Sequence, residues 1–132
     1  MITIDSNVLI RYIVRDDPVQ AERARRLLQE ELTAEEPGLI TVAALAKLCW
    51  VLRRGYRRSR EEIESIVLEL MQVEQLVFER AEAIEAALAS PHAGVVDSII
   101  HEVGRLLGSE KTLTFDRKFA RLDGVELLET AG

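Results

Sequence analysis

Short apolar runs alternate along the chain with longer segments whose apolar residues recur every three or four positions. The short runs predict β-strands, and the periodic segments predict amphipathic helices. The predicted strands cover residues 2–4, 39–42, 76–78, 112–115 and 125–128. The predicted helices begin near residues 8, 18, 43, 60, 81 and 96, and residues 116–122 form a turn of irregular helix. This alternation predicts a three-layer α/β/α sandwich with a mainly parallel central sheet.

Polar residues that suit helix caps precede several of these helices. Ser6 and Asn7 are candidates for the first helix, and Thr41 is the candidate for the third. Ser59 and Glu62 have the spacing of a capping box, in which each side chain bonds the backbone N–H of the other residue.

The late helix from residue 96 to residue 107 follows a loop at Pro91-His92-Ala93-Gly94. Its periodicity predicts a core-facing side made of Val96, Ile99, Ile100, Val103, Leu106 and Leu107.

Three aspartates stand at the ends of predicted elements. Asp5 follows the first strand, Asp116 follows the strand at 112–115, and Asp97 lies in the first turn of the late helix. The carboxyl ends of parallel strands line the ligand crevice of an open α/β sheet, so acids there are placed for chemistry. The alternative for Asp5 alone is a helix cap, which is a common role for aspartate. Together the three acids form one candidate site.

Composition predicts a soluble globular protein made of one domain, residues 1–132. Apolar residues make up 48% of the chain and charged residues 30%. No apolar run approaches the roughly 20 residues that cross a bilayer. The N-terminus has no basic region followed by an apolar stretch and a cleavage site, so we expect a cytoplasmic protein. The net charge of −6 argues against a general nucleic-acid coat but leaves room for a local basic patch.

The cysteine and histidines do not indicate a metal site with sulfur or nitrogen ligands. Cys49 is the single cysteine and lies in an apolar helical stretch, which predicts an inert core residue. His92 and His101 have no second partner at a recognisable zinc-ligand spacing. Any metal would therefore be held by carboxylates.

Five short motifs follow one another along the chain: Asp5-Ser6-Asn7-Val8-Leu9, Trp50-Val51-Leu52, Asp97-Ser98-Ile99-Ile100, Thr114-Phe115-Asp116-Arg117-Lys118-Phe119 and Gly124-Val125-Glu126-Leu127-Leu128. Their order and spacing resemble a PIN domain, and in particular the VapC toxins of VapBC toxin–antitoxin pairs. The resemblance implies an endoribonuclease that uses Mg²⁺ or Mn²⁺ to hydrolyse RNA. It also implies a cognate VapB-like antitoxin and a homodimer.

Three of the family's acids and two supporting polar residues can be assigned through the resemblance. Asp5, Asp97 and Asp116 match the metal-binding acids, and Asn7 and Thr114 match the polar residues that support them. Hard oxygen ligands of this kind suit Mg²⁺ and Mn²⁺.

The fourth acid is missing. Lys47 stands where family members commonly have glutamate, a few residues before Trp50. The replacement removes a ligand and changes the local charge by two units, so the ammonium competes with a cation. Either the chain is a weakened or inactive ribonuclease, or it is a PIN-fold protein that only binds an antitoxin or RNA. A third interpretation is that Lys47 turns towards solvent and leaves the site unaffected.

Basic residues near the predicted site are candidates for binding RNA phosphates. They are Arg11, Arg53, Arg54, Arg117 and Lys118. The alternative is that they are solvated helix ends and ion-pair partners, which is the commoner role of a charge run.

Two other enzyme classes fit less well. A haloacid-dehalogenase-type phosphatase needs a second aspartate two positions after the first, where this chain has Asn7. A response-regulator receiver needs a phosphoacceptor aspartate at the end of a central strand, and neither 40–41 nor 77–78 contains one.

Overall fold

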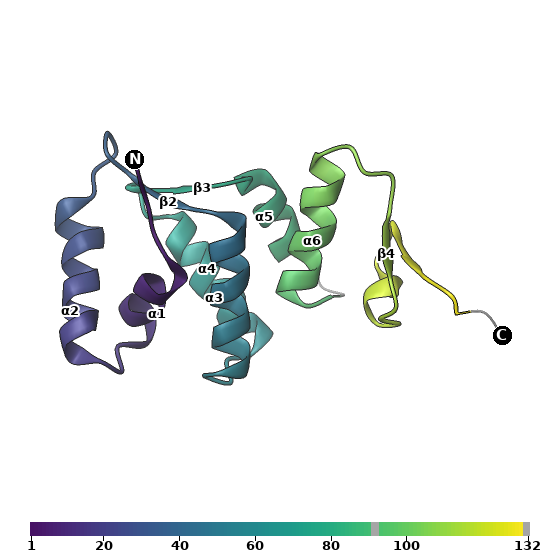
Figure 1. Ribbon diagram of the computed structural model, residues 1–132, viewed down its shortest axis with the longest axis horizontal. Helices are drawn as coiled ribbons and strands as arrows, with labels where there is room; N and C mark the ends of the chain where they lie inside the picture. Colours follow the sequence, from purple (N-terminus) through teal and green to yellow (C-terminus); the bar gives the residue numbers. More distant parts are fainter. Residues whose placement is uncertain (91–92, 131–132) are drawn as a thin grey trace. The chain divides into compact units, whose positions relative to one another are not determined.

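The computed structural model describes residues 1–90 and 93–130, so Pro91 and His92 of the predicted loop lie outside the described residues. The chain forms two compact units, residues 1–79 and residues 80–132 (Figure 1). Because this division does not decide whether the units form one domain, the prediction of a single domain stays a prediction.

No helix in the described ranges is long and apolar enough to span a membrane.

The first unit contains a parallel sheet of three strands in the order β1-β2-β3. Its elements are β1 (Ile2–Thr3), α1 (Ser6–Val14), α2 (Pro18–Arg26) continued by the π-helical turn η1 (Leu27–Glu31), β2 (Gly38–Ile40), α3 (Val42–Arg54), α4 (Arg60–Met71) and β3 (Leu76–Phe78). Ile2 pairs with Gly38, which pairs with Leu76. Gly38 and Ile40 are buried while Val77 is 43% exposed, so one face of the sheet packs on the helices of this unit.

Caps and apolar stripes explain the helices of the first unit. Thr41 accepts a hydrogen bond from the Ala44 N–H, and Ser59 and Glu62 form the predicted capping box. The buried side of α3 consists of Leu45, Leu48, Cys49 and Leu52. Burial raises the pKa of the Cys49 thiol to about 12, which confirms the prediction of an inert core cysteine.

The second unit contains two helices and a parallel pair of strands. Its elements are α5 (Ala81–Ala89), α6 (Val95–Leu106), β4 (Thr112–Thr114), the 3-10 turn η2 (Phe119–Arg121) and β5 (Val125–Leu127). Thr112 pairs with Val125. Ala93, Phe119 and Val125 form a buried cluster beside the sheet. Every strand pair in both units is parallel and helices separate the strands, so the predicted α/β/α class is confirmed.

The predicted core side of α6 is wrong in part. Ile99 is buried, but Ile100, Leu106 and Leu107 are 55%, 43% and 63% exposed. The buried side is instead made of Val95, Ser98, Ile99 and His101. His101, a polar residue, can occupy a core position because its ring has a hydrogen-bond partner, Thr112, on β4.

Candidate active site

Asp5 lies at the junction between β1 and α1, and its carboxylate makes no cap bond. It occupies the N-cap position of α1 with extended backbone angles, φ −72° and ψ 150°. The prediction that Ser6 or Asn7 caps this helix is wrong, because Ser6 is already helical and fully buried. The Ser6 hydroxyl donates to Asp5 Oδ1 over 3.3 Å. The exposed carboxylate of Asp5 is thus oriented by Ser6 and open to solvent.

Lys47 lines the same pocket as Asp5. The pocket lies between the end of β1 and the first turns of α3, with Thr3, Ser6 and Thr41 also in its wall. Lys47 is exposed and forms no ion pair within the described part of the chain. Asp5 and Lys47 therefore line one pocket without a salt bridge between them.

Asp97 and Asp116 lie near each other in the second unit. Partial burial is the larger cause that raises the pKa of Asp97, and the negative charge of Asp116 raises it further. Asp97 lies in the first turn of α6, where the helix dipole favours an ionised carboxylate, so burial and the charge of Asp116 together outweigh the dipole. A neighbouring pair of carboxylates is a favourable place for a cation to bind, because a cation offsets their repulsion.

The turn after β4 fixes Asp116. The Thr114 Oγ1 accepts a hydrogen bond from the Asp116 N–H over 3.0 Å. Asp116 Oδ1 accepts from the Lys118 N–H at 2.8 Å and from the Phe119 N–H at 3.1 Å. One carboxylate oxygen thus holds the turn while Asp116 stays exposed. Thr114 contacts the backbone of Asp116, and Asn7 is exposed on the first turn of α1.

The like charge of Asp116 predicts a measurable change in the titration of Asp97. Asp116→Asn should lower the pKa of Asp97 towards its ordinary value without restoring it, because burial remains. The folded protein binds the Asp97 proton more tightly than the unfolded chain. The contribution of Asp97 to stability is therefore present below its unfolded pKa and lost as pH rises through the folded pKa. Carbon-13 NMR titration of the carboxyl groups measures the change, and an unmoved Asp97 pKa would contradict it.

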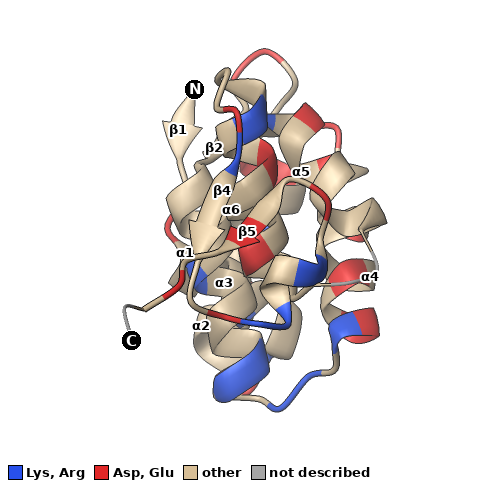
Figure 2. Ribbon diagram, turned by 90° about the vertical axis from the view of Figure 1, so that its right-hand side faces the viewer, with Lys and Arg blue, Asp and Glu red and all other residues tan. Residues whose placement is uncertain are grey.

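The candidate RNA-binding residues differ in their surroundings. Arg11 donates to Asp16 over 2.7 Å and to Gln20 over 2.8 Å, and the Asp16 bond raises the pKa of Arg11. Arg53 and Arg54 are exposed at the C-terminal end of α3, where basic positions gather (Figure 2). Arg117 and Lys118 are exposed directly after Asp116. Arg11 is thus engaged in a local ion pair, which favours its structural interpretation.

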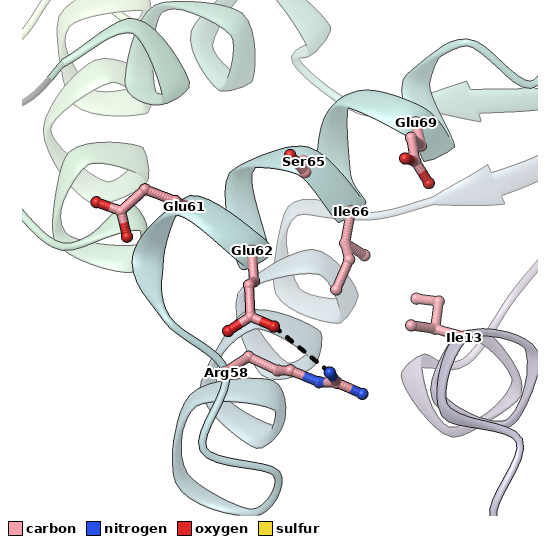
Figure 3. Close-up of a pocket in the computed structure, with 7 residues that line it drawn as sticks. All are labelled: Ile13, Arg58, Glu61, Glu62, Ser65, Ile66 and Glu69. Atoms are coloured by element: carbon pink, nitrogen blue, oxygen red, sulfur yellow. Dashed lines mark hydrogen bonds and ion pairs between the residues drawn. The ribbon is translucent and has the colours of Figure 1, made fainter.

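Arg58, in the same basic run as Arg53 and Arg54, faces an acidic groove between α1 and α4. Glu61, Glu62 and Glu69 line this groove with Ile13 and Ile66, and Arg58 pairs with Glu62 over 3.5 Å (Figure 3). This run therefore does not form one continuous phosphate-binding surface.

The sequence-predicted acids fall into two groups. Asp5 and the Lys47 position belong to the first unit, and Asp97 and Asp116 to the second. Among the residues described in either unit, no three His, Cys, Asp or Glu side chains gather as a metal-binding group. The convergence of all three acids stays a prediction.

A model of the PIN domain family matches residues 2–125, which includes all three candidate acids and nearly all of both units. No curated protein sequence gives a significant match. PIN domains are generally nucleases that use divalent metal ions, and many are toxins. The parallel strands and interleaved helices agree with this assignment. The chain belongs to the PIN domain family.

Proposed function

We propose that this chain is a Mg²⁺- or Mn²⁺-dependent endoribonuclease of the VapC toxin type, weakened because Lys47 occupies the usual glutamate position. The observation that carries the proposal is the PIN-family match over residues 2–125, within which Asp97 and Asp116 lie near each other in the second unit.

The chemistry of the donor set fits a divalent ion. Asp97 and Asp116 repel each other as carboxylates, and a cation would offset that repulsion. Asp5 is a third candidate carboxylate; it is exposed and is not used for capping. When bound, the ion would supply a more acidic water and offset the charge that develops on the phosphate.

Protein groups would position the acids and the RNA. Ser6 orients Asp5, and Thr114 holds the backbone of Asp116. We propose Asn7 as a further support. Arg117 and Lys118 follow Asp116 and would contact the phosphates nearest to it, with Arg53 and Arg54 as additional candidates. Because Arg11 is engaged by Asp16, we assign it the weakest contribution.

The position of Lys47 favours a second candidate function. Its ammonium shares a pocket with Asp5 and can take the place of a cation there. In that case the chain is a catalytically inactive PIN-fold protein that binds an antitoxin or RNA. In either case we propose a cytoplasmic homodimer that binds a VapB-like antitoxin.

Metal-dependent cleavage of a mixed RNA pool tests the ribonuclease proposal. The unsubstituted chain should cleave RNA slowly with Mn²⁺ and lose this activity in EDTA. Asp97→Asn should abolish the activity. Cleavage that persists in EDTA or in Asp97→Asn would indicate a contaminating nuclease. Absence of cleavage on tRNA, rRNA and mRNA, with tight binding to the protein encoded immediately upstream, would favour the partner-binding function.

A further inference from the structure

His101 is a buried polar residue on α6 for which the proposed function gives no role. Its side chain is 4% exposed, and its Nδ1 lies 2.8 Å from Thr112 Oγ1. Thr112 is the first residue of β4, so this hydrogen bond joins the helix to the strand. A buried imidazole with a side-chain partner rigidifies its surroundings, and losing the partner leaves a polar atom unsatisfied.

The same ring also lies against the turn before β5. A Cβ atom on Gly124 would be 3.1 Å from His101 Cε1, and Gly124 has φ +83°. The Gly124 carbonyl accepts a hydrogen bond from the Thr112 N–H over 2.9 Å. His101 therefore bonds the first residue of β4 and lies against the turn that leads into β5.

This contact joins the two elements that carry the acids of the second unit, because Asp97 lies on α6 and Asp116 follows β4. Asp97 precedes His101 by one helical turn, which is about 6 Å along the helix axis and on the same side of α6. Within this unit β4 runs back alongside α6 (Figure 1), so Asp116, which follows β4, lies in the same direction from the contact as Asp97. A shift of β4 along α6 would change the separation of the two carboxylates.

We propose that His101, through its hydrogen bond to Thr112, is a positioning residue that fixes β4 on α6 at the separation where Asp97 and Asp116 jointly bind a divalent cation. This inference rests on the proposed ribonuclease function. An apolar side chain at position 101 would fill the space but would not resist sliding of β4, because apolar contacts are not directional.

Substitution of Thr112 separates positioning from simple packing. Thr112→Val keeps the volume and removes the hydroxyl, whereas Thr112→Ser keeps the hydroxyl and removes a methyl group. Thr112→Val should weaken Mn²⁺ binding about 10-fold or more, as is typical when the partner of a ligand-orienting group is lost. Thr112→Ser should retain the affinity.

Calorimetric titration with Mn²⁺ in the Lys47→Glu background measures the affinity, and thermal unfolding measures the stability. The proposal is overturned if Thr112→Val lowers only the melting temperature and leaves the Mn²⁺ affinity unchanged. It is also overturned if Thr112→Ser loses as much affinity as Thr112→Val. Asp97→Asn in the same background distinguishes this proposal from the proposed function. If Asp97→Asn leaves the Mn²⁺ affinity unchanged, the metal site of the proposed function fails. If Asp97→Asn loses Mn²⁺ binding while Thr112→Val retains it, only the positioning role of His101 fails.

Discussion

Lys47→Glu is expected to tighten Mn²⁺ binding by about 10-fold or more and to raise metal-dependent RNA cleavage. The substitution removes an ammonium from the pocket that contains Asp5 and adds a carboxylate there. The added carboxylate supplies a further metal ligand, and about 1.4 kcal/mol corresponds to a tenfold change in affinity. Lys47 is exposed and lies off the buried side of α3, so the fold should tolerate the change.

Lys47→Gln is the matched control, because it removes the positive charge without adding a ligand. Calorimetric titration and assays on one RNA pool should give the highest Mn²⁺ affinity and cleavage rate with Glu at position 47, intermediate values with Gln and the lowest with Lys. If Gln and Glu give equal gains, position 47 acts only through its charge. If neither differs from Lys47, this residue does not limit function and the partner-binding proposal gains support.

Local sequence patterns predicted the elements well where the signal was itself local. The capping box of Ser59 and Glu62 and the cap at Thr41 depend only on residues within one helical turn, and both are confirmed. The first helix begins at Ser6 and not after it, because burial of the Ser6 side chain outweighs its preference for a cap position. That burial is set by packing and could not be predicted from the sequence pattern.

The candidate site was predictable in its residues and less so in its arrangement. Each acid was found from its place at the end of an element, and the pairing of Asp97 with Asp116 supports that logic. Lys47 was expected to compete at the site, and it does share the pocket with Asp5, yet it forms no ion pair in the ranges that the structure describes. The sequence pattern shows only that His101 lacks a partner at a zinc-ligand spacing. Its contact with Thr112 depends on how β4 packs on α6, which periodicity does not encode.

If Asp5, Asp97 and Asp116 hold one divalent ion, as we propose, the three residues should behave as one functional group. In the Lys47→Glu background, each single Asp→Asn substitution should lower RNA cleavage by about 100-fold or more, because each removes a proposed metal ligand. The triple variant should be little worse than any single one, as is typical of residues that act as a unit.

Asparagine is the suitable replacement because its side-chain oxygen can still accept the Lys118 and Phe119 N–H groups at position 116. Asp123→Asn is the matched control, since Asp123 is exposed and undergoes the same change of charge. Asp5 is the decisive residue, because it belongs to the first unit and the other two acids to the second. If Asp5→Asn behaves like Asp123→Asn while the other two variants lose activity, the cation is held by the second unit alone. Equal losses at all three positions would mean that catalysis requires both units to act on one site.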